Sequence, residues 1–95
     1  MEENKRLHAT VHGRVQGVGF RYFVMECANR LELTGWVRNR FNGTVELVAE
    51  GTQDKLDNLI RDLEHGSRSS NVTRVDHQMM AASGEFPRFG IRATG

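Results

Sequence analysis

Apolar and polar residues alternate near the amino end of the chain, where Leu7, Ala9 and Val11 are separated by polar side chains. This period of two predicts a β-strand with one apolar face. After a glycine-rich segment, apolar residues recur at spacings of three and four. That spacing predicts an amphipathic helix ending near Leu33, because a Thr-Gly pair follows. The apolar stripe consists of Phe20, Phe23, Val24, Cys27, Ala28 and Leu31.

The next two apolar segments, Trp36 to Phe41 and Thr44 to Glu50, predict a β-hairpin. Asn42-Gly43 lies between them and is typical of a type I′ turn, which requires positive φ at both central residues. Thr52 then stands where a side-chain cap for a second helix is expected. The apolar residues of the hairpin's second strand are Val45, Leu47 and Ala49.

A second amphipathic helix is predicted by the spacing of Leu56, Leu59, Ile60 and Leu63, and Gly66 is expected to end it. A fourth strand is expected over Val72 to Met79, with Val75, His77 and Met79 on one side. Phe89 and Ile91 suggest a short final strand, and Pro87 belongs at its start or on an edge because proline lacks an N–H.

The predicted order, β-α-β-β-α-β with a terminal strand, is typical of an α+β ferredoxin-like sandwich. In this fold two helices pack on one face of an antiparallel sheet, here of four to five strands. The right-handed split β-α-β arrangement makes the first strand central. It therefore places the Gly13–Arg21 segment at one end of the sheet, beside the hairpin.

Composition limits the alternatives. The 95 residues suffice for one domain, in which residues 1–6 are expected to be a flexible amino terminus. The 13 basic and 12 acidic side chains are nearly balanced, which argues against a nucleic-acid or anionic-membrane partner. The chain has no apolar run of about 18 residues and no visible signal peptide. With Cys27 as the single cysteine, these features predict a cytoplasmic protein.

The most informative segment is Gly13-Arg14-Val15-Gln16-Gly17-Val18-Gly19-Phe20-Arg21. Successive amides of a glycine-rich loop that leads into a helix can form a concavity of positive partial charge. A guanidinium at Arg21 suits two oxygens of one anion. The segment therefore predicts a site for a small oxyanion. The competing interpretation is a tight connection followed by a solvated arginine.

Asn39 is the second candidate, because asparagine is depleted in strands. Its amide could hold a water molecule near an anion at Arg21, or it could be a solvated residue near the hairpin tip. Arg14, Arg38 and Arg40 add positive charge, which either steers an anionic substrate or is solvated at the strand edges.

The histidines do not predict a metal site. His8 and His12 share a strand face but are separated by about 13 Å, too far for joint chelation. His65 and His77 also lack ligand spacing, so surface or packing positions are expected for all four histidines. Cys27 lies in the apolar helix stripe and is expected to be a buried thiol.

Two segments together resemble the acylphosphatase family. The stretch Val11 to Arg21 is similar to the first family signature. Gly35-Trp36-Val37-Arg38-Asn39, followed by Gly43-Thr44-Val45 and by Gly51, is similar to the second. The resemblance extends from about Leu7 to Ile91.

The resemblance implies hydrolysis of the carboxyl–phosphate bond of acyl phosphates, without a metal or an organic cofactor. Arg21 and Asn39 would be catalytic: Arg21 would bind phosphoryl oxygens, and Asn39 would position the attacking water. Inorganic phosphate would be product and inhibitor, and a monomer is expected. The phosphate-binding residues implied by the resemblance are Val15, Gln16, Gly17, Val18, Gly19, Phe20 and Arg21.

Two other functions compete with this interpretation. RNA-recognition domains share this order of elements, but they display aromatic side chains on the sheet within an Arg/Lys-Gly-Phe-x-Phe run that this chain lacks. The other alternative is an acylphosphatase-like domain of a larger maturation enzyme that senses or channels carbamoyl phosphate. A stand-alone hydrolase is the function we expect.

Overall fold

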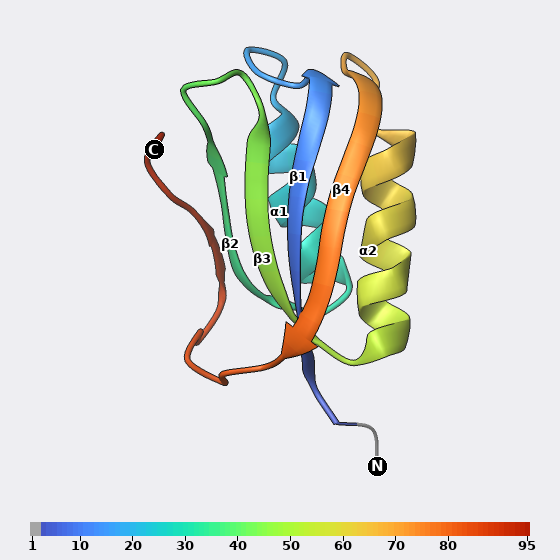
Figure 1. The fold of residues 1–95 in the computed structure, drawn as a ribbon, viewed down its shortest axis with the longest axis vertical. Coiled ribbons are helices and arrows are strands. Elements are labelled where there is room, and N and C mark those ends of the chain that lie inside the picture. The colour runs from blue at the N-terminus through green and yellow to red at the C-terminus, as the bar shows by residue number, and fades with distance from the viewer. Residues whose placement is uncertain (1–2) are drawn as a thin grey trace.

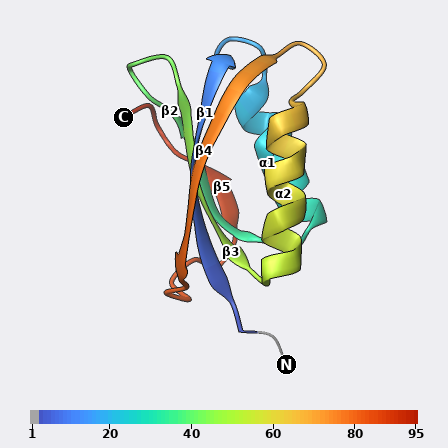
Figure 2. The same cartoon turned by 45° about the vertical axis from the view of Figure 1, so that its right-hand side comes forward.

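The computed structural model describes residues 3–95, which form two helices packed against one face of a single sheet (Figures 1 and 2). The order of elements is the one expected for a ferredoxin-like α+β sandwich. In chain order the elements are β1 (Lys5–Arg14), α1 (Phe20–Arg30), β2 (Thr34–Asn39), β3 (Val45–Gly51), α2 (Gln53–His65), β4 (Asn71–Ala81) and β5 (Phe89–Ile91).

The five strands are arranged in the order β4-β1-β3-β2-β5. As predicted, β1 is interior, with β3 and β4 antiparallel on its two sides. The expectation of a wholly antiparallel sheet was wrong for the last strand. β5 pairs parallel with β2, because the chain crosses the end of the sheet between β4 and β5 and so returns in the direction of β2 (Figure 1).

The core lies between the helices and the sheet. Leu7, Ala9 and Val11 of β1 are fully buried there, as their alternation predicted. β3 adds Val45, Leu47 and Ala49 in the register that faces the same side. The helices contribute the buried part of their apolar stripes, which is Phe20, Val24, Cys27, Ala28, Leu56, Leu59 and Leu63.

α1 ends at Arg30, three residues before the expected end. The Leu33 amide donates to the Ala28 carbonyl and the Glu32 amide donates to the Asn29 carbonyl, which is the pattern of a Schellman motif. Glu32 has a φ of 59° and occupies the left-handed position that glycine usually takes. The Thr-Gly pair therefore does not end the helix, and Thr34 already belongs to β2.

The hairpin does not contain the predicted type I′ turn. Among the described non-glycine residues only Glu32 has positive φ, so Asn42 is excluded from that geometry. The loop instead has three residues, closed by a hydrogen bond from the Arg40 amide to the Thr44 carbonyl, with Gly43 at a φ of 92°. Asn42 acts through its side chain, since Oδ1 accepts hydrogen bonds from the Thr44 amide and hydroxyl.

Four further expectations concern the two ends of α2, the extent of β4 and the amino terminus. Thr52 is the N-cap residue of α2, but its side chain makes no capping hydrogen bond, so the expected cap is absent. Gly66 ends that helix as predicted. β4 is longer than expected and runs from Asn71 to Ala81, with His77 exposed although it lies on the side of Val75 and Met79. The segment expected to be flexible, residues 1–6, overlaps β1, and residues 1 and 2 lie outside the described residues.

Candidate active site

The loop between β1 and α1 depends on two glycines in a left-handed conformation. Gly17 has a φ of 71° and Gly19, the N-cap residue of α1, a φ of 75°. A Cβ atom at either position would meet no atom of residues 3–95 within 4 Å, apart from the neighbouring residues in the chain. Backbone conformation, and not lack of space, is therefore the reason for glycine at both positions. Val15 is buried in the core below the loop and anchors its start.

The amides of this loop are free to bind a ligand. Among the hydrogen bonds within residues 3–95, none is donated by the backbone amides of residues 16–20. These amides directly precede and begin α1, so the positive end of the helix dipole lies beside them. Free amides at a helix N-terminus form a site that favours an anion.

Arg21 follows in the first turn of α1 and is half-buried. Its guanidinium forms no ion pair with a carboxylate and donates no hydrogen bond to a side chain within residues 3–95. By contrast, seven ion pairs in this part of the chain involve other arginines or lysines. A half-buried arginine without a partner among the described residues is suited to bind an anionic ligand.

Asn39 is the last residue of β2 and pairs with Val45. Because side chains alternate along a strand, Asn39 faces the same side as the buried Val37, which is the side of the helices. Its Oδ1 atom is buried and has no hydrogen-bond partner among the described residues. A buried acceptor without a partner is uncommon and indicates a place for a water molecule or a ligand.

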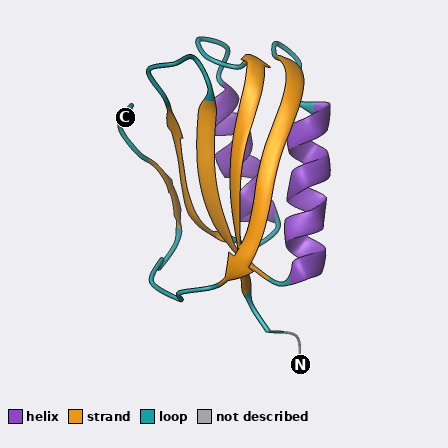
Figure 3. Ribbon diagram, viewed as in Figure 1, coloured by secondary structure: helices purple, strands orange, loops and turns teal. Residues whose placement is uncertain are grey.

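The fold brings these segments to one end of the molecule. The β1–α1 loop and the β2–β3 hairpin lie at the same end of the sheet (Figure 3), and α1 packs against β2. The side chain of Gln16 joins them, because its Nε2 donates to the carbonyls of Arg40 at 2.7 Å and Thr44 at 2.9 Å. Sequence reasoning placed Gln16 only among the loop amides and missed this contact.

Two of the three additional arginines share one carboxylate as an ion-pair partner. Arg38 Nε lies 2.9 Å from Glu46 Oε1, and Arg40 Nη1 lies 3.0 Å from the same oxygen. Burial, the largest effect on the Glu46 carboxyl, would raise its pKa. The hydrogen bonds from His8, Arg38 and Arg40 outweigh burial and lower the pKa to about 2. Arg38 and Arg40 therefore stabilise the ionised Glu46 on the uncovered face of the sheet. Arg14 is exposed at the end of β1.

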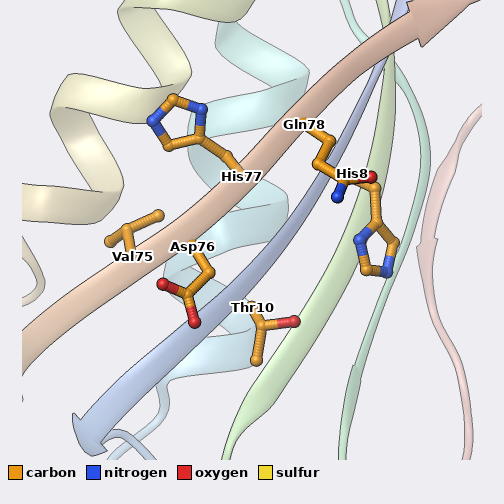
Figure 4. A pocket seen from close by; sticks show the side chains of 6 residues that line it. All are labelled: His8, Thr10, Val75, Asp76, His77 and Gln78. Atoms are coloured by element: carbon orange, nitrogen blue, oxygen red, sulfur yellow. The ribbon is translucent and has the colours of Figure 1, made fainter.

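A hollow of about 420 Å³ lies elsewhere, on the uncovered face of the sheet over β1 and β4 (Figure 4). His8 on its wall contacts Glu46 at 2.7 Å, and His12 nearby contacts Asp76 at 2.9 Å. Within residues 3–95 no group of three or more His, Cys, Asp or Glu side chains could hold a metal ion. The hollow contains none of the candidate site residues. Its lining residues are His8, Thr10, Val75, Asp76, His77 and Gln78.

Cys27 is free and buried, as expected from its place in the helix stripe.

The part of the chain that the structure describes contains no helix that is long and apolar enough to cross a membrane.

The fold and the loop define the class of protein: a ferredoxin-like sandwich with a candidate oxyanion site between its first loop and its hairpin. Comparison with known proteins gives the family. The sequence pattern of the acylphosphatase family matches residues 7–91. An acylphosphatase of Salinibacter ruber is 47% identical over 93% of this chain and 93% of its own. One of Pseudomonas aeruginosa is 51% identical over 82% of this chain and 86% of its own.

The solved structures agree with this result. The crystal structure of acylphosphatase from Bacillus subtilis superposes with a TM-score of 0.89 at 40% identity, covering 93% of this chain and 98% of that chain. The chain belongs to the acylphosphatase family. This confirms the family, the fold and the enzyme class that the sequence predicted.

Proposed function

We propose that this protein hydrolyses the carboxyl–phosphate bond of acyl phosphates to a carboxylate and inorganic phosphate. The amides of the Val15–Phe20 loop and the guanidinium of Arg21 hold the phosphoryl oxygens. Asn39 orients the attacking water. The observation that carries the proposal lies at one end of the fold. There the loop amides, the Arg21 guanidinium and Oδ1 of Asn39 have no hydrogen-bond or ion-pair partner within residues 3–95.

The proposed chemistry needs little covalent participation by the protein. Phosphoryl transfer is accelerated mainly by positioning and by electrostatic stabilisation of the equatorial oxygens. The water oxygen forms a bond to phosphorus as the bond from phosphorus to the acyl oxygen breaks, and the acyl group leaves as a carboxylate. A phosphoryl oxygen of the substrate accepts the proton of the water. A carboxylate is a good leaving group, so no general acid is required.

Hydrolysis of benzoyl phosphate in EDTA tests the activity directly. We expect turnover that survives chelation and is inhibited competitively by inorganic phosphate. Turnover that is lost on chelation would contradict the metal-free mechanism. A folded protein without turnover would contradict the proposed activity, and a phosphate titration would then show whether the loop still binds the anion.

Two substitutions test the assigned residues. Arg21→Ala is expected to lower kcat by at least about 10²–10³, the effect of losing a preorganised contact to a developing oxyanion. Asn39→Ala is expected to lower kcat while the phosphate inhibition constant changes little. Arg61→Ala and Asn58→Ala, on the exposed side of α2, are the matched controls. Near-wild-type turnover of Arg21→Ala would remove the role given to Arg21.

An RNA-binding function has less support. Trp36 of β2 lies on the uncovered sheet face, where a base could stack, but two guanidiniums lie over its ring. Arg38 lies 5.2 Å and Arg92 lies 4.7 Å from the ring centroid. A filter-binding titration at low salt is expected to give no tight RNA complex.

Location and oligomeric state stay predictions from the sequence. We propose a cytoplasmic monomer that binds small acyl phosphates and has neither nucleic acid nor membrane as a partner. Recovery of the protein in the cytoplasmic fraction after cell fractionation, and a sedimentation coefficient of a single chain, are the expected results.

A further inference from the structure

The side chain of Gln16 makes the contact that joins the β1–α1 loop to the β2–β3 hairpin. It is half-buried, and both of its hydrogen bonds cross to residues more than twenty positions away in the sequence. Both N–H groups of one Nε2 atom are used, at 2.7 Å to the Arg40 carbonyl and at 2.9 Å to the Thr44 carbonyl. The side chain therefore points toward the hairpin, and only the backbone amide of Gln16 remains for an anion.

The two acceptors are the residues that close the hairpin loop. The Arg40 amide donates to the Thr44 carbonyl at 2.9 Å, and the Gly43 amide donates to the Arg40 carbonyl at 3.1 Å. Each carbonyl thus accepts one hydrogen bond from within the hairpin and one from Gln16, which uses both of its lone pairs. Gln16 consequently fixes both ends of the loop relative to the β1–α1 segment.

Asn39 directly precedes Arg40, so the contact from Gln16 acts on the residue next to it. The Asn39 backbone is also held by its pairing with Val45 and by a hydrogen bond from the Gly95 amide to its carbonyl. The side chain of Asn39 is not fixed through Oδ1, which is buried and has no partner among the described residues. The position of the Asn39 side-chain amide therefore depends on the backbone at Asn39 and Arg40, and Gln16 contacts the Arg40 carbonyl. A displacement of about 1 Å at a reacting centre can cost a factor of about 10² in rate.

We propose that Gln16 is a positioning residue for Asn39: its side-chain amide sets the distance between the loop that binds the phosphoryl group and the amide that orients the water. The inference rests on the proposed function. It differs from a role in anion binding, since the side chain donates to the hairpin and not to the ligand.

The test replaces Gln16 with methionine, which has a similar length and no N–H donor. Gln16→Met is expected to lower kcat for benzoyl phosphate at least about 10-fold, with the inhibition constant of inorganic phosphate within about 3-fold of the wild type. Gln16→Asn, which keeps both donors on a shorter side chain, is expected to have an intermediate kcat and covers the case of a poorly folded methionine variant. Gln53→Met is the matched control, because the Gln53 amide donates to Asp57 on α2.

A double-mutant cycle separates positioning from general destabilisation. If Gln16 acts through Asn39, Gln16→Met added to Asn39→Ala lowers kcat little further. A full additional decrease would overturn the inference, and so would an unchanged kcat in Gln16→Met or a parallel loss of phosphate affinity.

A spectroscopic readout is independent of turnover. The NMR signals of the Asn39 side-chain amide are expected to shift in Gln16→Met and to stay in place in Gln53→Met. Unchanged Asn39 signals in Gln16→Met would overturn the inference even in an active enzyme. If the wild-type protein had no activity but the Asn39 signals still shifted in Gln16→Met, only the proposed function would be contradicted.

Discussion

At the scale of single residues, Glu32 occupies a conformation that its side chain does not favour. It has a φ of 59° at the C′ position of the Schellman motif that ends α1. The left-handed conformation costs a residue with a Cβ atom about 1 kcal/mol, which glycine avoids. The side chain also accepts a hydrogen bond from Lys55 at 3.3 Å, but this exposed ion pair contributes little.

We therefore expect Glu32→Gly to be more stable than Glu32→Ala by about 1 kcal/mol. Both variants lose the contact with Lys55, so their difference reports the backbone alone. Urea unfolding of the two variants measures it. Equal stability would show that the end of α1 relaxes to another conformation when the glutamate is removed.

At the scale of elements, Glu50 holds the segment between β4 and β5 against the sheet. Its buried carboxylate accepts hydrogen bonds from the Ser83 and Gly84 amides, both at 2.9 Å, and from Arg6 Nε at 2.7 Å. Burial, the largest effect, would raise the pKa of Glu50, but the Ser83 amide, Arg6 and the Gly84 amide together lower it. This contact explains how a segment without regular structure reaches the far edge of the sheet at β5.

Glu50→Gln replaces one acceptor oxygen with an N–H group facing donors. We expect it to destabilise the protein by about 2 kcal/mol and to speed hydrogen exchange at the Ser83 and Gly84 amides. Glu85→Gln is the control, because Glu85 contacts the same Arg6 but is exposed. Unchanged exchange in Glu50→Gln would indicate that the parallel pairing of β5 with β2 alone holds this segment.

At the scale of the whole molecule, stability in acid depends on the sheet face that the helices leave uncovered. Glu46 and Glu50, both on this face, are the buried carboxylates among the described residues. Glu46 contacts His8 of β1, Arg38 of β2 and Arg40 of the hairpin, so it joins three segments. The pKa of Glu46 is lowered from 4.5 to about 2. A carboxyl with a lower pKa in the folded state stabilises the fold above its unfolded pKa, and this stability is lost as pH falls from about 4.5 toward 2.

The wild type is expected to lose on the order of 3 kcal/mol over that pH window through Glu46. In Glu46→Gln the free energy of unfolding should be lower at pH 7 and should depend less on pH below 4.5. Urea unfolding at a series of pH values measures both effects. Glu64→Gln, an exposed position on α2, is the control. If the free energy of unfolding fell equally with pH below 4.5 in Glu46→Gln and in the wild type, Glu46 would be excluded as the main acid-sensitive group.

The sequence by itself determined the element order, the buried faces of β1, β3 and the two helices, the family and the candidate residues of the site. These follow from local periodicity and from two contiguous motifs, which are written directly in the chain. Tertiary structure decided the parallel pairing of β5, the three-residue hairpin loop, the partners of Arg38 and Arg40, and the contact of Gln16 with Arg40 and Thr44. Each of these depends on which groups distant in sequence complete one another's hydrogen bonds and charges, and local patterns do not carry that information.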